Sequence, residues 1–127
     1  MPQQAINHIE VRVETRYIEN QSVPEEHRYV FSYTITIHNQ GRLPARLINR
    51  HWLITDANGK VQEVKGKGVV GEQPHLKPGE TFSYTSGTIL ETPVGSMQGS
   101  YDMVDGTGNH FDAQIPAFSL ARPGSLH

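Results

Sequence analysis

A glycine-rich stretch flanked by lysines holds the residue types in this sequence best suited to bind a ligand. Residues 66–71 form a G-x-G-x-x-G pattern, and all four lysines of the chain lie within residues 60–77. Consecutive backbone N–H groups in a glycine-rich loop can form a concave anion-binding nest, and nearby lysines attract phosphate. The predicted binding residues are therefore Lys65, Gly66, Lys67, Gly68, Val69, Val70 and Gly71.

The same pattern does not predict a dinucleotide-binding fold. In that fold a helix begins directly after the glycines, and its N-terminus holds the pyrophosphate. Here Pro74, Pro78 and Gly79 follow within eight residues of Gly71, so no helix can form. A Walker A loop is excluded as well, because Lys67 is not followed by serine or threonine at the required place.

Two further interpretations of residues 66–71 stay open. In one, Gly66, Gly68 and Gly71 only permit tight turns and bulges at the edge of a β structure. In the other, Val69 and Val70 are exposed and form an apolar anchor within a polar rim, as in protein contact patches. We expect a non-enzymatic module that binds a protein partner, with phosphate or nucleotide binding by residues 65–71 as the alternative.

No arrangement of residues predicts catalysis. Ser86-Gly87 lacks the G-x-S-x-G context of a nucleophile elbow, and the chain contains no cysteine. None of the seven histidines is spaced two or four residues from another, so no metal-ligand pair is evident. We expect no catalytic residues, no metal ligands and no cofactor.

Composition narrows the class of protein. The chain has 127 residues and a formal net charge of −2, with a pI of about 6.4. This length predicts a single domain over residues 1–127, with a core over about 5–120 and a frayed C-terminal tail. The charge does not favour nucleic acid binding. No apolar run is long enough for a membrane helix and no signal peptide is recognisable, so we expect a cytoplasmic protein that binds no membrane.

Period-two alternation of apolar and polar residues predicts that β-strands position the glycine-rich stretch. It is clearest at residues 29–38 and recurs at 9–17, 46–55, 61–64, 81–85, 97–103 and 111–115, with Pro116 expected to end the last strand. Turn residues separate these segments and no helical period appears. The pattern predicts an all-β fold, an antiparallel β-sandwich of about seven strands, with a β-barrel as the nearest alternative. Trp52 with Tyr29, Phe31 and Tyr33 is assigned to the core, and Tyr101 to the hydrogen-bonded tyrosine corner of such sandwiches.

Four segments together resemble the ApaG family. They are 68–74 (GVVGEQP), 76–87 (LxPGExFxYxSG), 92–101 (TPxGxMxGxY) and 111–120 (FxxxIPxFxL), which span much of the chain. The resemblance implies a fibronectin type III or immunoglobulin-like sandwich, in agreement with the strands expected from alternation.

The resemblance also implies something about function. Similar domains occur alone in bacteria and at the C-terminus of some eukaryotic F-box proteins, where they look like protein-binding modules. In bacteria the family is associated with cobalt and magnesium homeostasis and with a neighbouring diadenosine-tetraphosphate hydrolase. A protein partner is the first expectation, and a diadenosine polyphosphate or pyrophosphate ligand is the alternative.

Overall fold

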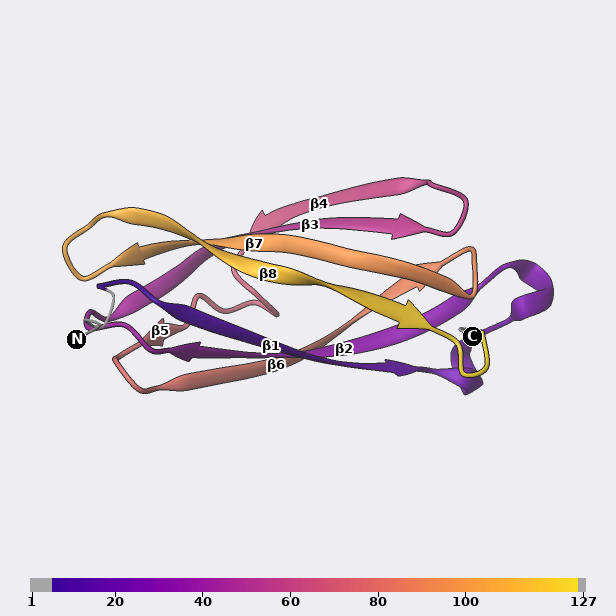
Figure 1. The fold of residues 1–127 in the computed structure, drawn as a ribbon, viewed down its shortest axis with the longest axis horizontal. Coiled ribbons are helices and arrows are strands. Elements are labelled where there is room, and N and C mark those ends of the chain that lie inside the picture. The colour runs from indigo at the N-terminus through magenta and orange to yellow at the C-terminus, as the bar shows by residue number, and fades with distance from the viewer. Residues whose placement is uncertain (1–5, 126–127) are drawn as a thin grey trace, which may run out of the picture.

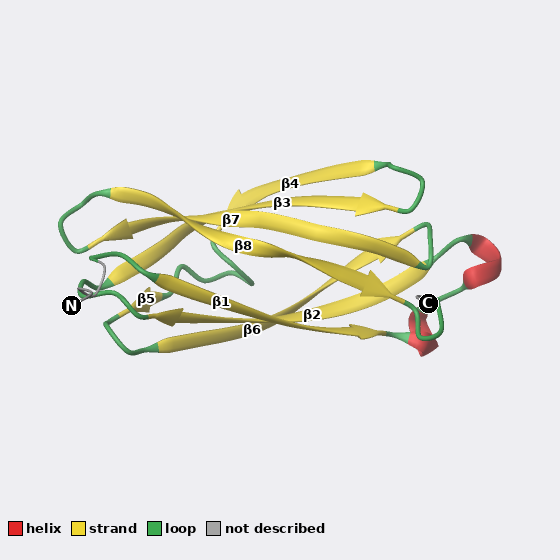
Figure 2. Cartoon of the chain, in the orientation of Figure 1, coloured by secondary structure: helices red, strands yellow, loops and turns green. Residues whose placement is uncertain are grey.

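The regular secondary structure of the chain is almost entirely β-strand. The structure, a computed structural model, describes residues 6–125. Its strands are β1 (Ile9–Tyr17), β2 (Tyr29–Asn39), β3 (Ala45–Asp56), β4 (Val61–Lys67), β5 (His75–Leu76), β6 (Thr81–Leu90), β7 (Val94–Asp105) and β8 (His110–Ala121). Two short 3₁₀ turns, η1 (Glu19–Gln21) and η2 (Pro24–Glu26), join β1 to β2 (Figure 2). Neither is long and apolar enough to cross a membrane.

The strands form two antiparallel sheets packed face to face (Figure 1). One sheet has the order β1-β2-β6, and the other has the order β4-β3-β7-β8 with β5 also paired to β3. Strand β1 contacts β8, which closes one side of the sandwich. Strands β4 and β6 are therefore the edge strands of the opposite side. An ion pair between Lys60 and Glu91 links the two sheets at one end of this open side.

The sandwich predicted from alternation is confirmed, with eight strands in place of about seven. The additional strand, β5, has two residues and pairs with β3, and two residues are too few for alternation to reveal a strand. Pro116 was expected to end the last strand, but β8 continues to Ala121. Pairing between β7 and β8 shifts at Met97/Gly99, so Pro116 lies in a bulge of an edge strand, where proline is tolerated.

The core lies between the sheets and is centred on Trp52. Its indole packs against the rings of Tyr33, Tyr101 and Phe118 in edge-to-face contacts, with centroids 5.4, 6.4 and 5.9 Å away. Tyr29, Phe31, Tyr33 and Trp52 are buried, which confirms their assignment to the core.

A bulge in β3 decides which side chains face the open side of the sandwich. The register between β3 and β7 shifts between Leu47 and Asn49, so that both Leu47 and Trp52 point inward although they lie five residues apart. Arg50 lies two residues before Trp52 and opposite the buried Tyr101, on the inward face. The bulge thus directs a guanidinium group toward the space between the sheets.

Candidate functional site

The glycine-rich stretch begins inside a strand. Gly66 and Lys67 belong to β4, where they pair with Arg50 and Asn49 of β3. The remaining residues form a miniature hairpin in which the Val69 N–H donates to the Glu72 carbonyl (2.8 Å) and the reverse bond is 2.9 Å. Figure 1 shows this connection between β4 and β5 dropping from one sheet toward the other.

The turn of this hairpin has an unusual residue at its first corner. Val70 has a φ of +44° and Gly71 a φ of +82°, the two positive values that characterise a type I′ turn. Asparagine or glycine normally occupies the first corner, because a β-branched side chain crowds its own backbone there. Val70 is thus a strained residue.

The expected exposure of the two valines is only half right. Val70 is 55% exposed, but Val69 is fully buried. Val69 pairs with Glu72 in the hairpin and packs into the core cluster, and the chain then reverses at Val70. The expectation for Val69 was wrong because the run Gly-Val-Val-Gly has no alternation that assigns its side chains to a face.

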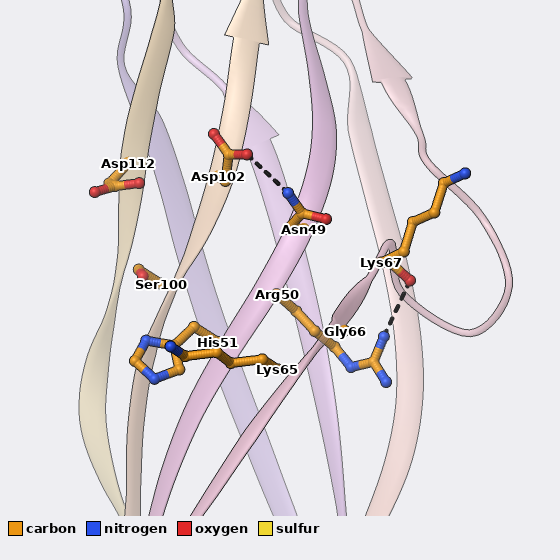
Figure 3. Close-up of a pocket in the computed structure, with 9 residues that line it drawn as sticks. All are labelled: Asn49, Arg50, His51, Lys65, Gly66, Lys67, Ser100, Asp102 and Asp112. Atoms are coloured by element: carbon orange, nitrogen blue, oxygen red, sulfur yellow. Dashed lines mark hydrogen bonds between the residues drawn. The ribbon is translucent and has the colours of Figure 1, made fainter.

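Arg50 crosses β4 to reach the loop. Its Nη1 donates to the carbonyl oxygen of Lys67 (3.1 Å; Figure 3) and to that of Gly68 (3.0 Å). A Cβ atom on Gly66 would lie 2.7 Å from the guanidinium carbon, so the missing side chain of Gly66 provides the path for Arg50. Sequence reasoning missed Arg50, since its role depends on the β3 bulge and on cross-strand pairing with Gly66.

The predicted anion-binding residues are divided between two surfaces. Lys65 and Lys67 pair with His51 and Asn49 and line the outer surface of the sheet, where the Lys67 side chain extends away from the Arg50 guanidinium (Figure 3). The loop N–H groups lie at the inner edge and are partly used within the protein. The N–H of Gly68 donates to Ile48 (2.8 Å), and that of Val69 donates to Glu72.

The outer surface holds an open depression of about 490 Å³. Basic and acidic side chains both line it: its residues are Asn49, Arg50, His51, Lys65, Gly66, Lys67, Ser100, Asp102 and Asp112. Asp102 accepts a hydrogen bond from Asn49 (2.9 Å) and lies 3.0 Å from the His110 Nδ1. The depression therefore contains charges of both signs, part of them already paired.

A smaller cleft lies on the inner side of the loop, and we call it the loop cleft. It has a volume of about 190 Å³ and is lined by Tyr33, Arg50, Trp52, Val69, Val70, Gly71, Tyr84 and Ser86. It therefore joins the loop to β2, β3 and β6 at the open side of the sandwich. Three aromatic side chains line it together with one charged group, Arg50, and most of its accessible lining belongs to polar atoms.

Two buried tyrosines lie next to the loop cleft. The hydroxyl groups of Tyr84 and Tyr101 are 2.5 Å apart and hydrogen-bonded. Tyr101 was expected to form a tyrosine corner, but the hydrogen bond that its hydroxyl forms joins it to the side chain of Tyr84. Burial raises the pKa of Tyr84 to about 12 and raises that of Tyr101 further. Both hydroxyls are therefore neutral near pH 7. Arg50 is the charged group in the lining of the cleft.

Among residues 6–125, no group of three histidine, aspartate or glutamate side chains is placed to hold a metal ion. His51 instead lies 2.9 Å from Glu63, whose pKa is lowered by the hydrogen bond from His51 and by the charge of Lys65.

Comparison with known proteins places these features in a family. The profile of the ApaG domain matches residues 19–105, which include the whole glycine-rich stretch. The chain belongs to the ApaG family. It is 59% identical over 119 residues to Protein ApaG of Pseudomonas aeruginosa, with 94% of each chain covered. It is 63% identical to Protein ApaG of Thiobacillus denitrificans over the same share of each chain. The resemblance drawn from the four sequence segments is confirmed.

Solved structures of related proteins share the fold. A crystal structure described as the putative ApaA protein from Bordetella pertussis has a TM-score of 0.94 and 49% identity, covering 97% of this chain and all of the other. A protein from Archaeoglobus fulgidus has a TM-score of 0.56 at 11% identity, covering 91% of this chain and 98% of the other, and is similar in fold alone. In this chain, that fold places the loop hairpin at the open side of the sandwich.

Proposed function

We propose that this ApaG chain is a non-enzymatic protein-binding module whose contact surface is centred on Val70. The strain at Val70 is the observation that carries the proposal. A β-branched residue at positive φ lowers stability by about 1–3 kcal/mol. Because the Val70 side chain is 55% exposed, its burial offsets little of this loss. Strain of this kind concentrates at functional sites, where a particular side chain is needed at a particular place.

The surroundings of Val70 support a contact patch. Val64 is 36% exposed and lies opposite Trp52, which lines the loop cleft together with Val70. An exposed apolar group beside a deeper aromatic wall is typical of the anchor region of protein interfaces. The edge strands β4 and β6 border this region, and edge strands present backbone groups that a partner strand can pair with.

Replacing Val70 with asparagine is expected to raise the free energy of unfolding by about 1 kcal/mol, because asparagine tolerates positive φ. Urea denaturation of the wild type and Val70→Asn measures the difference. Val61→Asn is the matched control: Val61 is 57% exposed but lies within β4, where asparagine gains nothing. A Val70→Asn variant less stable than the wild type would contradict the assignment of strain.

The binding proposal is tested with the same two variants. Biotinylated wild type, Val70→Asn and Val61→Asn are used to capture partners from lysate of the source cells, and bound proteins are quantified by mass spectrometry. The expected result is a protein retained by the wild type and Val61→Asn but lost with Val70→Asn, although this variant is at least as stable. Equal retention by all three chains would remove Val70 from the contact surface.

A second candidate function is phosphate or nucleotide binding at Lys65 and Lys67. It is favoured by one observation: within residues 6–125 neither ammonium group forms an ion pair with a carboxylate. Pyrophosphate, ATP and diadenosine tetraphosphate are titrated with and without Mg²⁺ while the amide signals of residues 66–71 are followed. Signals that stay still at millimolar ligand contradict this function, and a response unchanged by Lys67→Ala would rule out the assigned residues.

A further inference from the structure

Arg50 carries a positive charge that its surroundings only partly satisfy. The residue is half-buried, and only its Nη1 donates within residues 6–125, to the two carbonyl oxygens of the loop. No carboxylate of the described chain lies within 4.0 Å of the guanidinium. Figure 3 shows the group directed away from Asp102 and Asp112. Nε and Nη2 are therefore left as donors, and a partly desolvated charge favours an anionic partner.

The loop cleft limits what that partner can be. Its volume of about 190 Å³ is below the roughly 300 Å³ at which small-molecule and cofactor sites begin, so it matches a single side chain. Polar atoms make up most of the accessible lining, and the aromatic residues Tyr33, Trp52 and Tyr84 leave room for contact with only a short hydrocarbon stem. Arg50 and the hydroxyl of Ser86 are polar groups that suit a charged end.

The position of the cleft determines how a partner would approach. Tyr84 and Ser86 lie on β6, the edge strand of its sheet, so the cleft adjoins a strand that pairs with β2 on one side and with no strand of the described chain on the other. An extended segment that pairs with such an edge points alternate side chains toward the protein. Val70, on the loop, also lines the cleft and is exposed.

We propose that the loop cleft binds one carboxylate of an extended protein segment lying along β6. The carboxylate accepts hydrogen bonds from the Nε and Nη2 of Arg50, the side-on fork that arginine presents to carboxylates. An apolar neighbour in the same segment contacts Val70. This inference rests on the proposed protein-binding function and adds the chemistry that the partner must carry.

The test uses short capped peptides of alternating valine and threonine as probes. One peptide has a central glutamate, and a matched peptide has glutamine there. A third peptide lacks glutamate and is left uncapped at its C-terminus, so that it ends in a free carboxylate. Binding to the ¹⁵N-labelled chain is followed by NMR at the Arg50 Nε–H and the amides of Gly71 and Ser86. We expect the glutamate peptide to bind at least about tenfold more tightly than its glutamine match, as charge-assisted hydrogen bonds do.

Two variants connect this preference to Arg50. Arg50→Gln is expected to bind the glutamate and glutamine peptides equally, whereas Arg46→Gln, at an exposed position of the same strand, keeps the preference. Arg50→Lys retains the charge but lacks the forked donors of arginine, so it is expected to keep only part of the preference for the glutamate peptide. If Arg50→Gln does not fold, Arg50→Lys and the shift of the Arg50 Nε–H in the wild type still decide the question.

Each other outcome has a definite meaning. Equal binding of the matched peptides, the absence of shifts at millimolar peptide, or a preference that survives in Arg50→Gln overturns the carboxylate site. Tighter binding of the third peptide assigns the site to a chain terminus, and tighter binding of the first assigns it to an acidic side chain. If the site is overturned while a protein partner is still lost with Val70→Asn, the proposed function stands without it.

Discussion

Replacing Gly68 with alanine is expected to lower the free energy of unfolding by about 3 kcal/mol. Gly68 has a φ of +64°, which by itself costs an alanine about 1 kcal/mol. A Cβ atom here would also overlap the carbonyl oxygen of Glu72, which accepts the Val69 N–H. Because backbone cannot swing aside as a flexible side chain can, the hairpin has to open and Val69 loses part of its burial.

Gly71→Ala is the matched control for this prediction. Gly71 also has a positive φ, +82°, but a Cβ atom there would meet no atom within 4 Å. Its replacement is expected to cost only about 1 kcal/mol. Urea denaturation of both variants gives the difference, and equal losses would show that overlap with Glu72 contributes nothing.

Alternation was sufficient to predict the sandwich, because each long strand buries one face. In β2 the residues Phe31, Tyr33, Ile35 and Ile37 are buried while Ser32, Thr34 and Thr36 between them remain partly exposed. Local turn chemistry was equally informative. Asn58-Gly59 is a sequence typical of a hairpin turn, and Gly59 has a φ of +82° with its N–H bonded to the Asp56 carbonyl (3.1 Å). Strands and turns, which depend on a few neighbouring residues, could thus be predicted from the sequence.

The candidate site was less predictable because its geometry depends on distant pairing. Residues 69–71 of the predicted segment line the loop cleft, but Arg50, the charged group of that cleft, comes from β3. A bulge after Leu47 turns Arg50 inward, and pairing with Gly66 gives it room. Neither the position of a bulge nor the partner of an edge strand follows from local composition.

The structure explains the three glycines of the pattern, Gly66, Gly68 and Gly71, without a bound nucleotide. Gly66 admits Arg50, Gly68 fits against Glu72 at positive φ, and Gly71 forms the second corner of the turn. Together they allow Val70 and Arg50 to line one cleft. This joint placement is why the protein-binding proposal and the carboxylate site concern the same surface.

The protein is expected to lose stability steeply above about pH 10 because of the tyrosine pair. A tyrosine in the unfolded chain ionises near pH 10, whereas burial raises the pKa of Tyr84 to about 12 in the folded chain. The folded state therefore binds the Tyr84 proton more tightly than the unfolded state. The contribution of this difference to the free energy of unfolding is complete below pH 10 and declines as pH rises toward 12. Tyr84 alone accounts for a loss of about 2 kcal/mol by pH 12. Tyr101, whose pKa is also raised by burial, adds to this loss.

Urea denaturation at a series of pH values from neutral to alkaline measures this loss, and the double variant Tyr84→Phe/Tyr101→Phe is its control. Removing both hydroxyls together leaves neither without a partner, so stability near neutral pH is expected to change little. Tyr101→Phe alone leaves the Tyr84 hydroxyl without this hydrogen bond and is expected to cost about 1–3 kcal/mol at neutral pH. If the alkaline loss persists undiminished in the double variant, other groups cause it, and the buried pair does not control the pH dependence of the fold.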